Sequence, residues 1–247
     1  MLRPADCSGR GGVSLAADLL DLIFPPACVS CAELLETRGP YCGLCALGLE
    51  PVPRPGCSRC AEPDPAGKLC RRCRLRPPPF ASARAAFVHE GPLARAIHRF
   101  KYEGRSELAS PLGRAFADAE GEWLASMGPG ALLVPIPLHR RRLLRRGYDQ
   151  AALLARALAS ATGLRHEPGL LRRERATRRQ VGLSEGQRLA NVTGAFVVAG
   201  PVAVQPLVLI DDVFTTGATA RAASAALVEH GAGVVHVLTL ARAVGWE

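Results

Sequence analysis

Aromatic residues and long apolar runs are both scarce in this 247-residue chain, in which phenylalanine, tryptophan and tyrosine make up 5% of the residues. The longest uncharged run, residues 189–210, contains two glycines and two prolines, so it predicts two strands and a turn rather than a membrane span. The first apolar stretch, residues 14–24, carries Asp18 and Asp21 and lacks the pattern of a secretory signal. We therefore expect no membrane span and a cytoplasmic location.

Positive charge, in contrast, is in excess. The 31 basic and 22 acidic residues give a formal net charge of +9. An anionic partner is consistent with this charge, although an arginine-rich composition alone also produces it. The shortage of aromatic rings limits base stacking, for which Phe100, Tyr102 and Tyr148 are the nearest candidates.

Eight of the nine cysteines form four Cys-x-x-Cys pairs. Disulfides are not expected in the cytoplasm, whereas tetrahedral zinc takes four thiolates, and two such pairs can complete one site. The spacing predicts two four-cysteine zinc sites, whose motifs could pair sequentially, in an interleaved order or in a nested order. We favour sequential pairing, in which one site is Cys28, Cys31, Cys42 and Cys45 and the other is Cys57, Cys60, Cys70 and Cys73.

Both zinc ions are expected to be structural. The surrounding sequence is rich in proline and glycine and poor in large apolar residues, so the metal must supply much of the folding free energy. Four protein ligands leave no open position for catalysis. Each zinc with four thiolates carries a charge of −2, which lowers the net charge from +9 to about 9 − 4 = +5.

The chain divides into three expected parts: a tail with an amphipathic helix at 1–24, a double zinc ribbon at 25–78, and a larger domain at 79–247. The three prolines of "RLRPPPF" mark the second boundary. Alternating strands and helices in the large domain predict an α/β fold, a mainly parallel sheet flanked by helices. Strands are expected at 84–89, 132–137, 168–172, 194–199, 207–211 and 234–242, and helices at 92–102, 107–127, 149–163, from Ser184, and before Gly231, with a basic loop after 132–137.

The stretch "LVLIDDVFTTGATA", residues 207–220, suggests a ligand site. Ligands of such sheets lie beyond the carboxyl ends of the strands, where small residues and a helix N-terminus can hold a phosphate. Two carboxylates beside such a turn suit a ribose with free hydroxyls, or Mg²⁺. A 5-phosphorylated ribose fits both features, whereas a simple turn and helix cap would need fewer polar residues. The residues concerned are Asp211, Asp212, Thr215, Thr216, Gly217, Ala218 and Thr219.

Two arginine clusters, on loops expected at the ligand end of the sheet, could form a groove for single-stranded DNA. Two alternatives are that they bind the phosphates of the smaller ligand or are simply solvated loop charges. The clusters contain Arg140, Arg141, Arg142, Arg145 and Arg146, and then Arg172, Arg173, Arg175, Arg178 and Arg179. The predicted nucleic-acid contacts are Arg141, Arg142, Arg145, Arg146, Arg178 and Arg179.

The segment "VLIDDVFTTGAT" resembles the phosphoribosyl-pyrophosphate (PRPP) signature of the type I phosphoribosyltransferases. Together with "FKYEGRSELASPLGRAF", "PIPLHRRRLLRRGYDQAALLARAL" and "RRQVGLSEGQRLANVTGAF", it is similar to the ComF family of competence and DNA-uptake proteins. The resemblance implies a double zinc ribbon followed by a phosphoribosyltransferase-type domain. Family members often have Phe-Asn where Tyr148-Asp149 stands here.

The resemblance also implies individual roles. Asp211 and Asp212 would contact the ribose hydroxyls, and residues 215–219 would hold the 5-phosphate. His139 and Arg140 would lie near the diphosphate, bridged by Mg²⁺. Residues 172–187 would form a mobile loop that closes over the ligand. No catalytic residue is assigned.

Two functions follow from this resemblance. The first is a protein that binds PRPP and single-stranded DNA and acts in DNA uptake and natural transformation, with competence or recombination proteins as partners. The second is an active PRPP-dependent phosphoribosyltransferase of purine or nucleotide salvage metabolism. An amidotransferase is disfavoured because no glutaminase nucleophile follows Met1.

Overall fold

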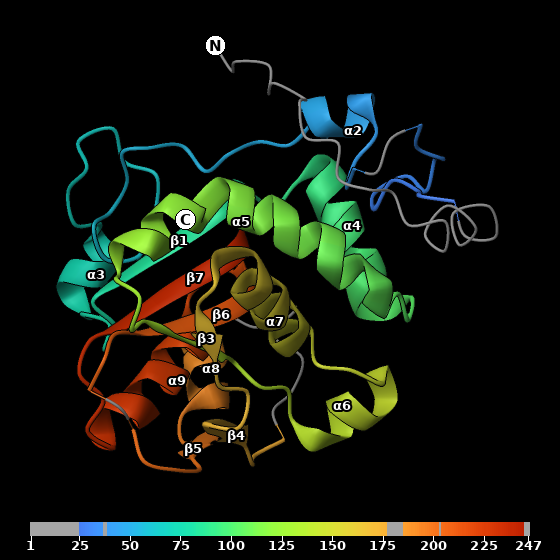
Figure 1. Ribbon diagram of the computed structural model, residues 1–247. Coiled ribbons are helices and arrows are strands. Elements are labelled where there is room, and N and C mark those ends of the chain that lie inside the picture. Colours follow the sequence, from blue (N-terminus) through green and yellow to red (C-terminus); the bar gives the residue numbers. More distant parts are fainter. Residues whose placement is uncertain (1–24, 37–38, 177–184, 203, 245–247) are drawn as a thin grey trace.

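A five-stranded parallel sheet forms the centre of the molecule (Figure 1). The computed structural model describes residues 25–36, 39–176, 185–202 and 204–244. Within these ranges the strand order is β1-β7-β6-β2-β3. The strands are β1 (Ser82–Val88), β7 (Val235–Arg242), β6 (Leu207–Phe214), β2 (Leu132–Pro135) and β3 (Arg165–His166). The expected α/β fold with a mainly parallel sheet is confirmed.

Helices cover both faces of this sheet, and Figure 1 shows α5 and α9 on opposite sides of the strands. Leu207 and Leu209 of β6 belong to the core cluster that includes α9, whereas Val208 and Ile210 belong to the cluster that includes α5 and α7. Successive side chains of a strand point to opposite faces, which explains why β6 is apolar at consecutive positions. The helices are α4 (Gly91–Tyr102), α5 (Ala109–Ser126), α7 (Gln150–Thr162) and α9 (Ala218–Glu229), with a 3₁₀ turn η1 (Ser106–Leu108) between α4 and α5.

Four of the expected segments differ in the structure. Strand β6 continues to Phe214 rather than ending at 211, because its backbone pairs with β7 over this length. The strands near 168–172 and 194–199 are β4 (Leu171–Arg173) and β5 (Phe196–Val198), which form a separate antiparallel pair. The loop after β2 contains a helix, α6 (Arg140–Arg146), which begins at the His139 side-chain cap and ends at Gly147 in the left-handed conformation.

The cysteine region is joined to the sheet domain by packing. Short helices α2 (Gly43–Leu47) and α3 (Arg71–Leu75) each begin directly after a cysteine. Cys28 and Cys45 belong to the core cluster of α4, α5 and α7, while Cys57, Cys60 and Cys73 belong to the α9 cluster. Each half of the ribbon region therefore contributes to a different face of the sheet. The predicted helix at 14–24 lies outside the described residues.

Helix α8 (Glu185–Val192) lies beside α9, and its start agrees with the helix expected from Ser184. None of the helices in the described part of the chain combines the length and apolar character needed to cross a membrane.

A buried carboxylate links the ribbon region to α5. Glu120 has 1% of its side chain exposed, and its Oε2 lies 2.8 Å from Nε of Arg84 on β1. Its other oxygen pairs with Arg54, which belongs to the segment between the two cysteine groups. Removing one partner of a buried ion pair leaves the remaining charges without compensation.

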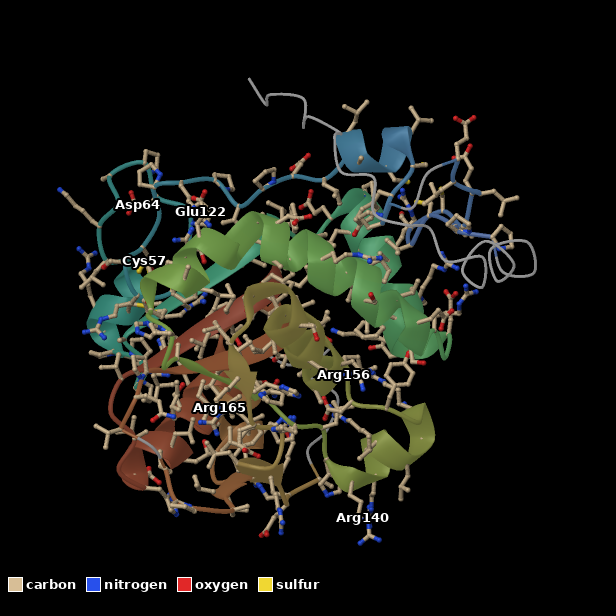
Figure 2. All side chains as sticks on the ribbon, viewed as in Figure 1. Cys57, Asp64, Glu122, Arg140, Arg156 and Arg165 are labelled. Atoms are coloured by element: carbon tan, nitrogen blue, oxygen red, sulfur yellow. The ribbon has the colours of Figure 1, made fainter. Side chains whose placement is uncertain are left out.

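We predict that Glu120→Ala lowers the free energy of unfolding by about 3 kcal/mol, the lower part of the range for a broken buried pair because both arginines keep some solvent contact. Urea denaturation measures this change. Glu122→Ala is the control, since Glu122 is an exposed carboxylate on the same helix (Figure 2) and its loss should change stability by less than about 0.5 kcal/mol. Equal effects of the two substitutions would contradict the role of the buried pair.

Candidate functional site

The cysteines form two compact groups within the described residues, and the grouping follows the chain order. The first cysteine site is Cys28, Cys31, Cys42 and Cys45, and the second cysteine site is Cys57, Cys60, Cys70 and Cys73. In each group the four sulfur atoms lie within 4.8 Å of one another. This arrangement agrees with the sequential pairing that the spacing favoured.

The geometry of both groups fits tetrahedral zinc. Zinc–sulfur bonds of about 2.3 Å place neighbouring sulfurs about 3.8 Å apart. The Sγ atoms of Cys31 and Cys42 are 3.7 Å apart, and those of Cys60 and Cys70 are 3.6 Å apart. Burial raises the pKa of Cys57, but amide hydrogen bonds from Cys70 and Cys60 outweigh it and bring the pKa to about 7. Such amides stabilise the thiolate that a metal requires.

A second candidate site lies at the carboxyl end of the sheet, where titratable side chains from β6, α4 and the end of β1 meet. The carboxylate of Asp212 on β6 pairs with Nζ of Lys101 from α4, at 2.7 Å from its Oδ1. The amide of Asp212 donates to Oδ1 of Asp211 at 2.8 Å. His89 follows β1 at the same end, where burial, followed by the charge of Lys101, lowers its pKa.

Three carboxylates repel one another in this site. Burial, followed by the charge of Asp212, raises the pKa of Asp211 to about 7. Burial also raises the pKa of Asp149. Amide hydrogen bonds from Leu138 and Ala152 lower this pKa in part, and the charge of Asp212 raises it further. A bound cation would relieve this repulsion, so the site is suited to a metal ion or a ligand that carries one.

The turn between β6 and α9 contains the residues that were predicted to bind a phosphate, and its geometry is fixed by a glycine. Gly217 adopts φ +75°, and a Cβ atom there would lie 2.5 Å from Cζ of Phe214, so only glycine fits. Gly217 is also the N-cap of α9, and no side-chain cap is found among the described residues. The hydroxyl of Thr216 is buried and lacks a hydrogen-bond partner within the described part of the chain. The hydroxyl of Thr216 and the positive end of the α9 helix dipole are therefore both suited to an anion.

The simpler interpretation, in which the threonines cap α9, does not agree with this geometry, because the cap position is occupied by glycine. Thr215 and Thr216 precede the cap, while Ala218 and Thr219 are the first residues of α9. The predicted PRPP-binding residues of this segment thus surround a single helix N-terminus.

The turn after β2 is held by Asp149 rather than left open. Oδ2 of Asp149 accepts from the amide of Leu138 at 2.6 Å, and Oδ1 accepts from the amide of Ala152 at 3.1 Å, which caps α7. The ring of Tyr148 stacks on Phe100 with 5.6 Å between centroids. Both residues thus position the turn and α4, which gives a physical role to the pair that departs from the common Phe-Asn.

Comparison with known proteins gives concordant results. A family model described as the double zinc ribbon domain matches residues 19–74. The DNA utilization protein YhgH of Salmonella typhimurium is 32% identical over 219 residues, which cover 87% of this chain and 89% of that protein. The chain belongs to the ComF family. Competence protein F of Haemophilus influenzae is 29% identical and covers 87% of this chain and 90% of its own length. Competence protein ComFC of Bacillus subtilis is 28% identical, with 85% and 87% covered.

In this ComF-family protein, His139 and Arg140 do not point together into the carboxylate site. Nε2 of His139 lies 3.0 Å from the carbonyl of Glu174, and its Nδ1 accepts from the amide of Arg141 at 3.2 Å. Both ring nitrogens therefore have protein partners. Figure 2 shows the side chain of Arg140 directed away from the body of the molecule. Their predicted contact with a diphosphate stays a prediction.

The first arginine cluster lies on α6, not on a loop as expected, because a capped helix satisfies the backbone groups of this segment. Arg140, Arg141 and Arg145 are exposed, and Arg142 is half-buried. The guanidinium of Arg146 lies 5.3 Å from the ring centroid of Tyr102. This helix therefore presents a basic surface next to α4.

The second arginine cluster is only partly described. Arg178 and Arg179 lie outside the described residues, as does half of the predicted mobile loop at 172–187. Arg173, which was expected on a loop, is buried in β4 and stacks on Phe196 at 5.3 Å. Burial, followed by the charge of Arg142, lowers the pKa of Arg173 to about 10. The guanidinium of Arg175 donates to the carbonyls of residues 191 and 193.

Sequence reasoning missed Lys101 and His89 as members of the carboxylate site. The position of His89 directly after a predicted strand is a signal that could have found it, since strand ends of a parallel sheet meet at one edge. The contact of Lys101 with Asp212 arises from the packing of α4, which the sequence does not reveal.

The grouping of the cysteines predicts the zinc content of double variants. Cys28→Ala with Cys45→Ala removes two ligands from one site and should leave one zinc per chain, because the second site stays complete. Elemental analysis of the purified protein measures this. The control, Cys28→Ala with Cys73→Ala, disrupts both sites and should leave none. Loss of both zinc ions from the first variant would indicate interleaved or nested sites.

Proposed function

We propose that this ComF-family protein acts in the uptake or use of DNA and that it binds PRPP with Mg²⁺ and single-stranded DNA. Relatives that cover most of the chain carry the names DNA utilization protein and competence protein. The observation that carries the PRPP part is the juxtaposition of an uncapped helix N-terminus with the Asp211–Asp212 pair. We infer the DNA part from these names and from the basic surface of α6.

PRPP matches the site in two ways. Its 5-phosphate would accept from the first amides of α9 and from the hydroxyl of Thr216, which has no partner in the described residues. Its ribose hydroxyls would donate to the carboxylates of Asp211 and Asp212. Lys101 would then exchange its bond to Asp212 for one to the ligand or stay as a counter-charge.

Mg²⁺ suits the same site because burial, followed by the charge of Asp212, raises the pKa of Asp211, and burial raises the pKa of Asp149. A divalent cation bound with the diphosphate would lower the energy of the ionised carboxylates. In this proposal the diphosphate lies toward the turn after β2, which Asp149 holds in place.

Single-stranded DNA would lie along α6. Arg141 and Arg145 are four residues apart and both exposed, so they lie on the same side of the helix. The ring of Tyr102, which is 56% exposed beneath Arg146, offers one surface for a base. With so few aromatic rings, phosphate contacts should supply most of the affinity.

An active phosphoribosyltransferase remains a second candidate, favoured by the pairing of Asp212 with Lys101. A protein that had lost PRPP chemistry would have no evident need for a partly buried lysine against a ribose-binding carboxylate. Release of pyrophosphate from PRPP in the presence of nucleobases or amines distinguishes this candidate from binding alone.

We predict that PRPP with Mg²⁺ raises the melting temperature of the protein and that Asp212→Asn removes most of this rise. At a ligand concentration of 100 times Kd the stabilisation is about 2.7 kcal/mol, because the ligand binds only the folded state. Differential scanning calorimetry measures the melting temperature of each protein with and without the ligand. Because the two proteins are compared by this difference, a change in the stability of the ligand-free variant does not affect the result.

Asp118→Asn is the control for this measurement, since Asp118 is exposed on α5 and its loss removes the same charge. It should keep the full rise. An unchanged melting temperature of the unsubstituted protein at saturating PRPP would falsify the proposed site.

We predict that Arg141→Glu with Arg145→Glu weakens the binding of a single-stranded oligonucleotide. The slope of log affinity against log salt should become shallower by about 1.4, since each phosphate contact of a single strand contributes about 0.7. Fluorescence anisotropy over a range of salt concentrations measures both effects.

Arg156→Glu with Arg165→Glu is the matched control, with the same change of charge. Both residues are exposed, and Arg165 pairs with Leu132 at the amino end of β2, away from the proposed groove. Its slope should stay close to that of the unsubstituted protein. If both double variants lose affinity equally, only the net charge matters and α6 is not the binding surface.

A further inference from the structure

A buried arginine connects the second cysteine site to the turn that is proposed to bind phosphate. Arg242 is the last residue of β7, is 1% exposed and lies opposite Phe214 in the register of β6 and β7. Its NH1 donates to the carbonyl of Cys60 at 2.5 Å, and its NH2 pairs with Glu62. The same guanidinium carbon lies 4.9 Å from the ring centroid of Phe214.

The ring of Phe214 in turn supports the turn at residues 215–217. Phe214 is 4% exposed, and Phe80 contacts its ring edge-on with 6.4 Å between centroids. The ring occupies the space directly beneath Gly217, where even a Cβ atom would lie 2.5 Å from it. A shift of this ring therefore displaces the backbone of the turn, because protein interiors are close-packed and contain no empty space that could absorb the movement.

The acceptor of Arg242 is fixed by the second cysteine site. The amide of Cys57 donates to the carbonyl of Glu62 at 2.7 Å, and the amide of Ala61 donates to the carbonyl of Cys57 at 2.9 Å. These bonds close a short loop whose two cysteines are ligands, so a bound metal holds the Cys60 carbonyl in place. Without it, Arg242 faces a loop that can move, and a buried guanidinium loses its partners.

We propose that Arg242 and Phe214 are positioning residues through which the second cysteine site fixes the phosphate-binding turn. Zinc at this site, which is remote from the ligand, thereby sets the affinity for a phosphorylated sugar. The inference rests on the proposed PRPP site for its effect on affinity, while its effect on the turn itself is independent of any ligand.

Arg84 provides a matched comparison. Its guanidinium likewise pairs with a carboxylate, that of Glu120, and its guanidinium carbon lies 5.3 Å from the ring centroid of Trp123. It lies on the edge strand β1 opposite Leu238 of β7, and its side-chain contacts with Glu120 and Trp123 involve neither Phe214 nor the turn. Arg84→Met thus removes the same kind of interaction without the proposed coupling.

The experiment measures the affinity of PRPP with Mg²⁺ by calorimetry and the hydrogen exchange of the amides at 215–220 by mass spectrometry. Arg242→Met should weaken the affinity at least tenfold and accelerate exchange at 215–220, while Arg84→Met changes the affinity less than twofold and leaves this exchange unaltered. Phe214→Leu, which keeps the bonds of Arg242 to the ribbon, should act like Arg242→Met and serves if the latter fails to fold. Cys57→Ala with Cys73→Ala, which removes the second zinc, should also accelerate exchange at 215–220.

The outcomes are separable. If the unsubstituted protein does not bind PRPP, the proposed function fails and the exchange data alone decide the positioning role. If it binds PRPP and Arg242→Met or Phe214→Leu binds equally well, the inference is wrong while the proposed function stands. Unchanged exchange at 215–220 in both variants and in the zinc-deficient protein would also overturn it.

Discussion

The burial of β6 on both faces is the constraint on which the rest of the structure depends. Its aliphatic side chains alternate between the α5–α7 cluster and the α9 cluster, so the strand can neither slide nor tilt. The same strand carries Asp211 and Asp212 to the edge of the sheet and ends at Phe214, from which the turn begins. The apolar packing of β6 therefore fixes the positions of Asp211, Asp212 and the turn that follows them.

The cysteine region strengthens this frame because it does not form an independent unit. Each cysteine group belongs to one of the two core clusters, and arginines of the sheet domain donate to backbone carbonyls next to the cysteines. Arg99 on α4 donates to the carbonyls of Cys28 and Val29, and Arg242 donates to that of Cys60. We therefore expect metal binding at the cysteines to be coupled to folding of the sheet domain.

Charge is distributed unevenly around the carboxyl end of the sheet. Carboxylates gather near the strand ends, where burial and mutual repulsion raise the pKa of Asp211 and Asp149. Arginines gather on α6, where most side chains stay in solvent. The first arrangement suits a small ligand that brings a cation, and the second suits a polyanion held by many weak contacts. Because the carboxylates and the α6 arginines are different side chains, a small ligand and a polyanion would not compete for the same protein groups.

The sequence by itself determined the fold class, the four Cys-x-x-Cys pairs and the residues of the turn at 215–219, because these depend on local periodicity, spacing and residue size. It did not reveal α6 as a helix, the pairing of β4 with β5 apart from the main sheet, or the burial of Arg173. Only the tertiary structure brought Lys101 to Asp212, which are more than 100 positions apart in the chain. It also placed Arg242 against the ring of Phe214, more than 20 positions away. Such contacts result from the packing of elements that are distant in sequence, and no local pattern encodes them.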